Sequence, residues 1–89
     1  MEAKFSVEGE LGLHARPAGR FVTLAGRFES EIWVARDGDE EWVSGQSVLS
    51  ILSLAASQGT ILRLRAEGPD AEEALQSLGA LLAEPTQTV

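Results

Sequence analysis

The chain has 89 residues, of which 44% are hydrophobic, and its fourteen acidic and seven basic residues give a net charge of −7. This composition predicts one folded domain over residues 1–89, and the acidic balance disfavours nucleic acid and anionic membranes as partners. With no cysteine and one histidine, we expect no metal site and no cofactor. The amino-terminal stretch "MEAKFSVEGE" has no long apolar run, so we expect a cytoplasmic protein without membrane insertion.

The first third of the chain predicts a strand followed by a helix. Residues 3–8 alternate between apolar and polar side chains, which is typical of a strand. Residues 15–25 then space their apolar side chains at helical intervals, and Gly26 suits the end of that helix. The expected inward positions are Ala3, Phe5, Val7, Ala18, Phe21, Val22 and Ala25.

The stretch "EIWVARDGDEEWV", residues 31–43, predicts a hairpin around an Asp37-Gly38 turn. If these two residues form the centre of the turn, Trp33 lies opposite Trp42 on one face. Ile32 and Val43 then pair on the other face. We interpret the two tryptophans as a cross-strand pair that stabilises the hairpin rather than as a binding site.

The remaining sequence predicts a short helix, a strand and a longer helix. Ser47 opens the apolar helix "SVLSILSLAAS", and residues 60–67 alternate as a strand with Leu62, Leu64 and Ala66 inward. Gly68 and Pro69 end that strand.

Asp70 and Glu73 resemble a capping box at the start of the last helix. Pro85 ends that helix, and residues 85–89 are expected to form a frayed tail. The order β-α-β-β-α-β-α predicts an α+β fold with helices on one face of an antiparallel sheet, although the lengths also allow a ferredoxin-like arrangement.

The chemistry of the chain centres on "GLHARPA", residues 12–18, which holds the only histidine. Pro17 fits the first turn of a helix, so the helix should begin at about Arg16 or Pro17 with Ala15 as its cap. Alanine cannot accept hydrogen bonds from first-turn amides, and no acidic residue follows. A helix that begins in this way presents free N–H groups and a positive dipole end, which together suit an anion.

The neighbours of His14 favour phosphoryl chemistry. The guanidinium of Arg16 matches phosphate oxygens, and its charge, like the helix terminus, disfavours the imidazolium form of His14. The neutral ring can attack phosphorus, with the phosphoryl oxygens on the amides of Ala18 and its neighbours, and Gly12 allows the tight turn before the histidine. A lone histidine near a helix start is usually an ordinary surface residue. The coincidence of histidine, arginine, proline and a missing cap in adjacent positions favours a phosphohistidine site instead.

"GLHARPA" resembles the active-site motif of HPr, the histidine phosphocarrier of the bacterial phosphoenolpyruvate:sugar phosphotransferase system. "SVLSILSLAASQGT" and "EGPDAEEAL" extend the resemblance over nearly the whole chain. The resemblance implies an open-faced β-sandwich with strand order 1-4-2-3 and three helices on one side. It further implies that His14 accepts a phosphoryl group on Nδ1 from enzyme I and passes it to the A domain of an enzyme II. Such a protein is a monomeric carrier rather than a turnover enzyme.

The resemblance also implies roles for other residues. Arg16 would be the partner of the phosphohistidine, while Ala15, Pro17 and Ala18 form the helix start under the phosphate. Ser47 falls where many relatives carry a regulatory serine that HPr kinase/phosphorylase modifies, but we favour a plain N-cap because Gln46 replaces their usual basic residue. The expected partner-binding patch comprises Val48, Leu49, Leu52, Gly19 and Arg20.

Two departures from the family pattern and two alternatives remain at this point. One departure is the hairpin turn "ARDGDEE", which is longer and more acidic than is usual in relatives. Leu11 stands where relatives commonly have Asn or Ser, so it cannot orient the histidine by a hydrogen bond. One alternative is an HPr-like regulatory module that binds a kinase, transcription factor or metabolic enzyme without feeding sugar uptake. A more distant one is an acyl carrier protein, although those are all-helical and have Asp where this chain has Gln46.

Overall fold

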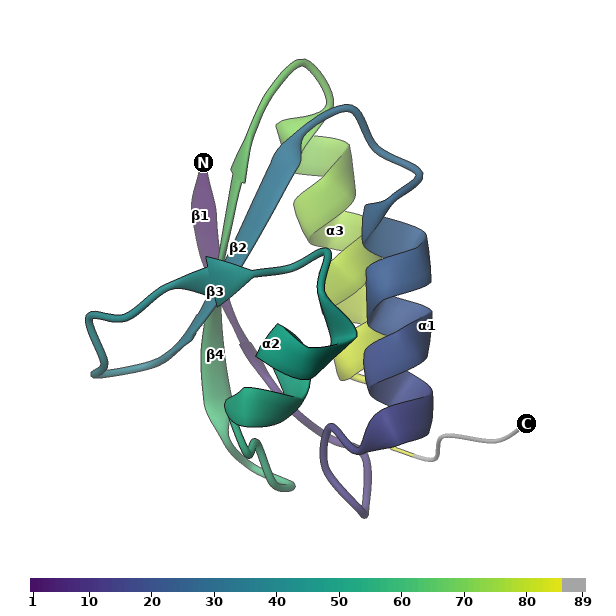
Figure 1. Ribbon diagram of the computed structural model, residues 1–89, viewed down its shortest axis with the longest axis vertical. Helices are drawn as coiled ribbons and strands as arrows, with labels where there is room; N and C mark the ends of the chain where they lie inside the picture. Colours follow the sequence, from purple (N-terminus) through teal and green to yellow (C-terminus); the bar gives the residue numbers. More distant parts are fainter. Residues whose placement is uncertain (86–89) are drawn as a thin grey trace.

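Four antiparallel strands form one sheet in the order β1-β4-β2-β3, and three helices cover one of its faces (Figure 1). The computed structural model describes residues 1–85, so the expected tail lies outside the described residues except for Pro85. This architecture confirms the predicted fold class and element order. The elements are β1 (Glu2–Ser6), α1 (Ala15–Ala25), β2 (Glu31–Arg36), β3 (Val43–Ser44), α2 (Val48–Ser53), β4 (Ile61–Glu67) and α3 (Ala71–Leu82).

The core lies between the sheet and the helices, as the alternation of apolar residues predicts. Every second residue of β4 faces inward, and Leu62, Leu64 and Ala66 are fully buried. Phe5 of β1 pairs with Leu62 and packs against Gly79 of α3, where an added Cβ would lie 2.2 Å from the phenylalanine ring. A residue without a side chain is therefore needed there for α3 to reach the sheet.

The hairpin keeps the predicted Asp37-Gly38 turn but not the predicted register. The Asp39 amide donates to the Arg36 carbonyl at 3.0 Å, yet pairing resumes only with Val34 opposite Val43 and Trp33 opposite Ser44. The predicted pairing of Trp33 with Trp42 is therefore wrong by two positions. A shift of two keeps each side chain on its predicted face.

Contacts with β4 explain why β2 and β3 do not pair directly after the turn. The Asp37 amide donates to the Ile61 carbonyl at 2.9 Å, and the Arg63 guanidinium donates to the Asp39 carbonyl. These bonds hold Asp37 and Asp39 against β4, and the bond to Arg36 is the last one to β2 before pairing resumes at Val43. On the uncovered face of the sheet, Arg63 lies 4.7 Å from the ring centre of Trp42 and Arg65 lies 5.7 Å from that of Trp33. Both tryptophans thus pack on arginine side chains of β4.

Asp70 is the N-cap residue of α3, but its side chain makes no capping hydrogen bond, so the predicted capping box is wrong. Its carboxylate instead accepts from the backbone amides of Glu29 and Ser30, each at 2.9 Å, and from the Ser30 hydroxyl. The segment after α1 presents these three donors together. The two oxygens of the Asp70 carboxylate accept from all of them. The Ser30 hydroxyl and the two amides lower the pKa of the Asp70 carboxyl.

We predict that Asp70→Asn lowers the free energy of unfolding at neutral pH, because the amide cannot replace an ionised acceptor of three hydrogen bonds. A lowered folded-state pKa adds stability that is complete above the unfolded value of about 4 and disappears as the pH falls through the folded value. The difference between the variant and wild type should therefore shrink below about pH 4. Urea unfolding at several pH values measures this difference in the free energy of unfolding. Glu73→Gln, an exposed acid in the same helical turn, is the control, and an Asp70 difference that persists unchanged at pH 2 would contradict the prediction.

Candidate functional site: the amino-terminal end of helix α1

Helix α1 begins one to two residues earlier than the sequence predicts, and His14 rather than Ala15 is its N-cap residue. His14 has an extended backbone, and its carbonyl accepts the first helical hydrogen bond from the Ala18 amide at 2.9 Å. Pro17 is consequently the third helical residue. Proline is tolerated there because first-turn N–H groups have no partner within a helix.

The predicted lack of capping at this helix is confirmed. The His14 side chain makes no capping hydrogen bond, and the first turn contains no acidic residue. Since the Ala18 amide already donates to His14, the amides left for an anion are those of Ala15 and Arg16. Pro17 and Ala18 are buried and anchor the helix start, whereas His14 is half-buried and Arg16 is exposed. The arrangement can therefore bring an anion next to the imidazole.

The residues before His14 lie tightly against the connection between α2 and β4. Gly12 has a φ of +70°, which confirms the predicted tight turn, and an added Cβ would lie 2.3 Å from the Ala56 carbonyl oxygen. The next residue, Leu13, is buried and its amide donates to the same carbonyl at 2.9 Å. This contact was not foreseen from the sequence, because Ala56 carries no side-chain feature that marks it. The hydrogen bond fixes the backbone immediately before His14.

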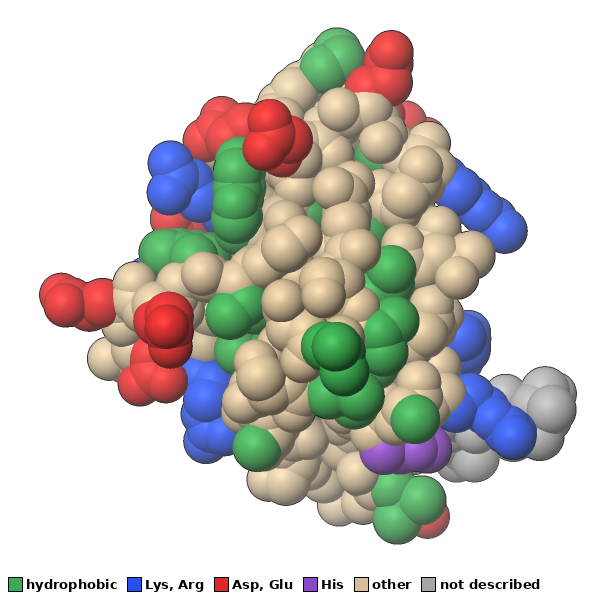
Figure 2. Space-filling model, viewed as in Figure 1, with side chains coloured by type: hydrophobic (Ala, Val, Ile, Leu, Met, Phe, Trp, Pro, Cys, Tyr) green, Lys and Arg blue, Asp and Glu red, His purple; other side chains and the backbone are tan. Residues whose placement is uncertain are grey.

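An exposed apolar surface lies beside the histidine. Leu49 is 80% exposed and Val48 is 37% exposed, as expected for a contact surface, whereas Leu52 is half-buried against the core. Leu11 is 78% exposed and adds a further apolar side chain just before the histidine segment. Figure 2 shows the histidine at the lower edge of this face, with hydrophobic side chains above and below it.

Ser47 is the N-cap residue of α2, and its hydroxyl accepts from the Ser50 amide at 3.3 Å. This bond confirms the predicted capping role. Ser47 is half-buried at the same end of α2 as Val48, so the cap and the exposed apolar surface are adjacent.

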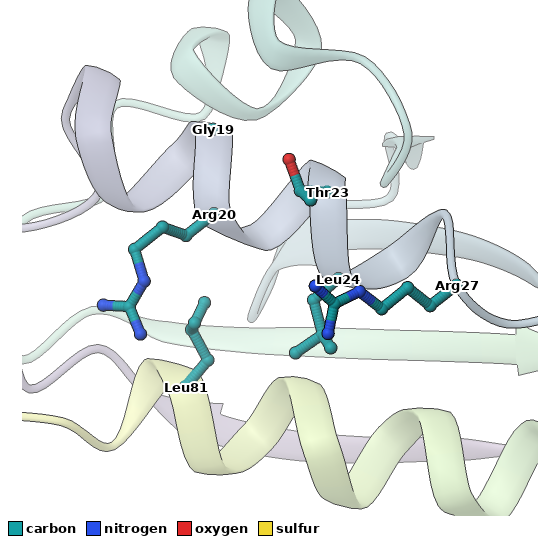
Figure 3. Close-up of a pocket in the computed structure, with 6 residues that line it drawn as sticks. All are labelled: Gly19, Arg20, Thr23, Leu24, Arg27 and Leu81. Carbon is teal, nitrogen blue, oxygen red and sulfur yellow. The ribbon is translucent and has the colours of Figure 1, made fainter.

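Gly19 and Arg20, the other two residues expected in the partner-binding patch, line a pocket of about 510 Å³ between α1 and α3. Figure 3 shows the Arg20 side chain extending from α1 toward α3, where Leu81 points back toward it. The Arg20 guanidinium forms a two-bond ion pair with Glu84, at 3.1 and 3.3 Å. Arg20 is thus held in place at one end of the pocket, and Arg27 lies at the other.

Two structural features are absent from the described part of the chain. Residues 1–85 contain no group of three or more His, Asp or Glu side chains that could hold a metal ion. Over the same residues, no helix is both long enough and apolar enough to pass through a lipid bilayer.

Comparisons with known proteins agree on one family. The family model described as "PTS HPr component phosphorylation site" matches residues 1–84. The phosphocarrier protein HPr of Haloferax volcanii is 39% identical over 85 residues, which cover 96% of each chain. The HPr-like protein Crh of Bacillus subtilis is 40% identical over 84 residues, which cover 94% of this chain and 96% of Crh. A crystal structure of HPr from Bacillus anthracis superposes with a TM-score of 0.86 at 39% identity, covering 92% of this chain and 95% of the other.

These matches and the 1-4-2-3 sheet define the class of protein, a domain of the type named for the HPr component of the phosphotransferase system. The chain belongs to the HPr family. The acyl carrier alternative is wrong, because it requires an all-helical chain and four strands are present.

We predict that Gly12→Ala lowers the free energy of unfolding by about 2 kcal/mol or more, through left-handed strain and the clash with the Ala56 carbonyl. Gly38→Ala is the matched control, because Gly38 also has a positive φ of +95° but an added Cβ there meets no atom within 4 Å. The control should lose only about 1 kcal/mol. Urea unfolding measures both changes, and equal losses at the two positions would show that the Ala56 contact contributes nothing.

Proposed function

We propose that the protein carries a phosphoryl group on Nδ1 of His14, accepting it from phosphorylated enzyme I and passing it to the A domain of a sugar-specific enzyme II. The observation that carries the proposal is the half-buried His14 at the start of an uncapped helix whose first turn has no acidic residue. Membership of the HPr family supplies the phosphotransferase role. The cytoplasm is the proposed location, since the partners named here act on that side of the membrane.

The proposed transfer uses the local charges in a simple way. The neutral ring of His14 attacks phosphorus through Nδ1, the P–N bond forms, and the bond from phosphorus to the donor breaks with its electron pair returning to the donor. The guanidinium of Arg16 and the amides of Ala15 and Arg16 then face the phosphoryl oxygens. Because these groups favour negative charge without forming a covalent bond, the phosphoryl group can leave again to the next acceptor.

Partner binding in this proposal uses the exposed side chains of α2 next to the histidine. Val48 and Leu49 supply apolar contact area, and Leu52 supports them from below. Gly19 and Arg20 border the site on α1, where the lack of a side chain at Gly19 allows a partner to approach closely. Arg20 would contact a partner while it is oriented by Glu84. We propose the same residues for enzyme I and for the enzyme II A domain, with the protein acting as a monomer.

Similarity to Crh supports a second candidate, a regulatory module of the same fold. Crh is described as the catabolite-repression HPr of Bacillus subtilis, and its solution structure is 37% identical to this chain with a TM-score of 0.67. Under this alternative the same surface binds a regulatory partner, and Ser47 is the residue that HPr kinase/phosphorylase would modify. The Ser47 hydroxyl would then exchange its cap bond to Ser50 for a phosphate at the same helix end.

We predict that phosphoenolpyruvate and enzyme I label the wild-type protein in an acid-labile form and that His14→Ala abolishes the label. The measurement is mass spectrometry of the intact protein before and after mild acid, with site mapping at neutral pH. His14 is half-buried and is not a residue of the core, so the unfolding curve of His14→Ala serves as the folding control. A label that persists in His14→Ala would overturn the assignment of the site. Absence of any label on the wild-type protein would favour the regulatory module.

We predict that Leu49→Ala raises the KM for this protein in phosphorylation by enzyme I about tenfold, because a partner loses a central apolar contact. Its kcat should change far less, since Leu49 is not adjacent to the reacting atoms. Ile61→Ala is the control, because Ile61 is also an exposed aliphatic residue but lies on the uncovered face of the sheet. Equal effects of the two substitutions would remove Leu49 from the binding surface.

A further inference from the structure

The residue after helix α2 and its C-cap, Ala55, has a left-handed backbone with a φ of +51°. It is the only residue other than glycine with a positive φ among residues 1–85. This conformation brings the Cβ of an L-amino acid close to its own backbone, and glycine would adopt it at no steric cost. Something in the surroundings must therefore stabilise Ala55 in this state.

Arg36, the last residue of β2, adds to that stabilisation, beside the hydrogen bond from the Ala55 amide to the Leu52 carbonyl at 3.0 Å. Its Nη1 donates to the Leu54 carbonyl at 2.9 Å and to the Ala55 carbonyl at 3.3 Å. These carbonyls lie at the end of α2, where the helix dipole favours a positive charge. Within residues 1–85, Arg36 forms no ion pair with a carboxylate, so its guanidinium is directed to the backbone of this turn.

The turn that Arg36 holds is the one on which the histidine segment rests. The carbonyl of Ala56, directly after Ala55, accepts from the Leu13 amide and lies against Gly12. Leu13 is followed by His14, the N-cap residue of α1. Four covalently or hydrogen-bonded steps thus connect the Arg36 guanidinium to the histidine backbone. The direction of the Ala56 carbonyl depends on the φ and ψ of Ala55, because rotation about these bonds reorients the residue that follows directly.

We propose that Arg36 is a positioning residue for phosphoryl transfer: by holding Ala55 in the left-handed conformation, it aims the Ala56 carbonyl at Leu13 and so fixes His14. This inference rests on the proposed function for its kinetic consequence. Its structural part, the coupling of Arg36 to the Leu13 amide, is independent of what His14 does.

The test compares Arg36→Met, Ala55→Gly and the double variant. Methionine keeps an unbranched, flexible side chain of similar length but has no donor, so Ala55 can leave the strained state and the Ala56–Leu13 hydrogen bond weakens. Glycine at position 55 adopts the left-handed conformation without the Arg36 hydrogen bonds. The double variant should therefore recover most of the activity and Leu13 protection that Arg36→Met loses. Arg36→Lys retains one donor group. Its kcat and its Leu13 exchange rate should therefore lie between those of the wild-type protein and those of Arg36→Met. Arg65→Met is the matched control, since it removes an arginine from the opposite face of the sheet.

Two readouts separate positioning from a loss of folding. Arg36→Met should lower the kcat of phosphorylation by enzyme I about tenfold, with KM changed by no more than about twofold, because the reacting nitrogen is misplaced while the Leu49 surface is kept. Hydrogen exchange of the Leu13 amide, followed by NMR, should accelerate about tenfold, while amides of central β4 stay protected. Ala55→Gly in the same chain should restore both values.

The outcomes are distinct. Wild-type rate and Leu13 exchange in Arg36→Met would overturn the inference, and so would a defect that Ala55→Gly fails to restore or that Arg65→Met reproduces. If enzyme I labels no form of the protein, the proposed function fails. The Leu13 exchange pattern would then still decide whether Arg36 controls this turn.

Discussion

The hydrogen bond from the Leu13 amide to the Ala56 carbonyl is the contact on which the rest of the site depends. It joins two connections that are far apart in the sequence, one leading from β1 into α1 and the other leading from α2 into β4. Because of it, the start of α1 and the exposed side chains of α2 belong to a single surface. A reactive side chain at a helix terminus and an apolar contact surface can then serve the same encounter with a partner.

The two ends of this surface are held by different kinds of force. Burial of Leu13, Pro17 and Ala18 fixes the histidine segment on the inner side. On the other side, charge-assisted bonds to backbone carbonyls fix the turn after α2. The amide ends of α1 face outward without a capping side chain, an arrangement that slightly destabilises the helix in isolation and leaves room for an anion. The surrounding contacts thus stabilise the start of α1, and its first-turn amides stay available to bind an anion.

Much of this fold could be predicted from the pattern of apolar residues. The period-two alternation of residues 61–67 and the helical spacing of residues 15–25 each match one buried face, since both elements have one side in the core. The uncapped helix start was also predictable, because no Ser, Thr, Asp or Asn occurs near His14. The predicted start at Arg16 or Pro17 lies one to two residues late, because proline fits the third helical position as well, where an N–H group also lacks a helical partner.

Features that depend on contacts between distant segments could not be predicted. The register of the hairpin is set by Ile61 and Arg63 on another strand, and Asp70 caps a different segment from the one its spacing indicates. Ala55 gives no signal, because glycine is the residue that marks a left-handed turn in a sequence. The strain there is visible only once the backbone is known.

The short strand β3 has a consequence for solubility at high concentration. It forms one edge of the sheet, and an edge strand offers unpaired amides and carbonyls to any other chain that comes alongside. Here the edge has only two residues, Val43 and Ser44, and it follows three consecutive acids, residues 39–41. A second strand would find too few hydrogen bonds and would meet concentrated negative charge. The acidic loop before β3 thereby protects this edge against edge-to-edge aggregation.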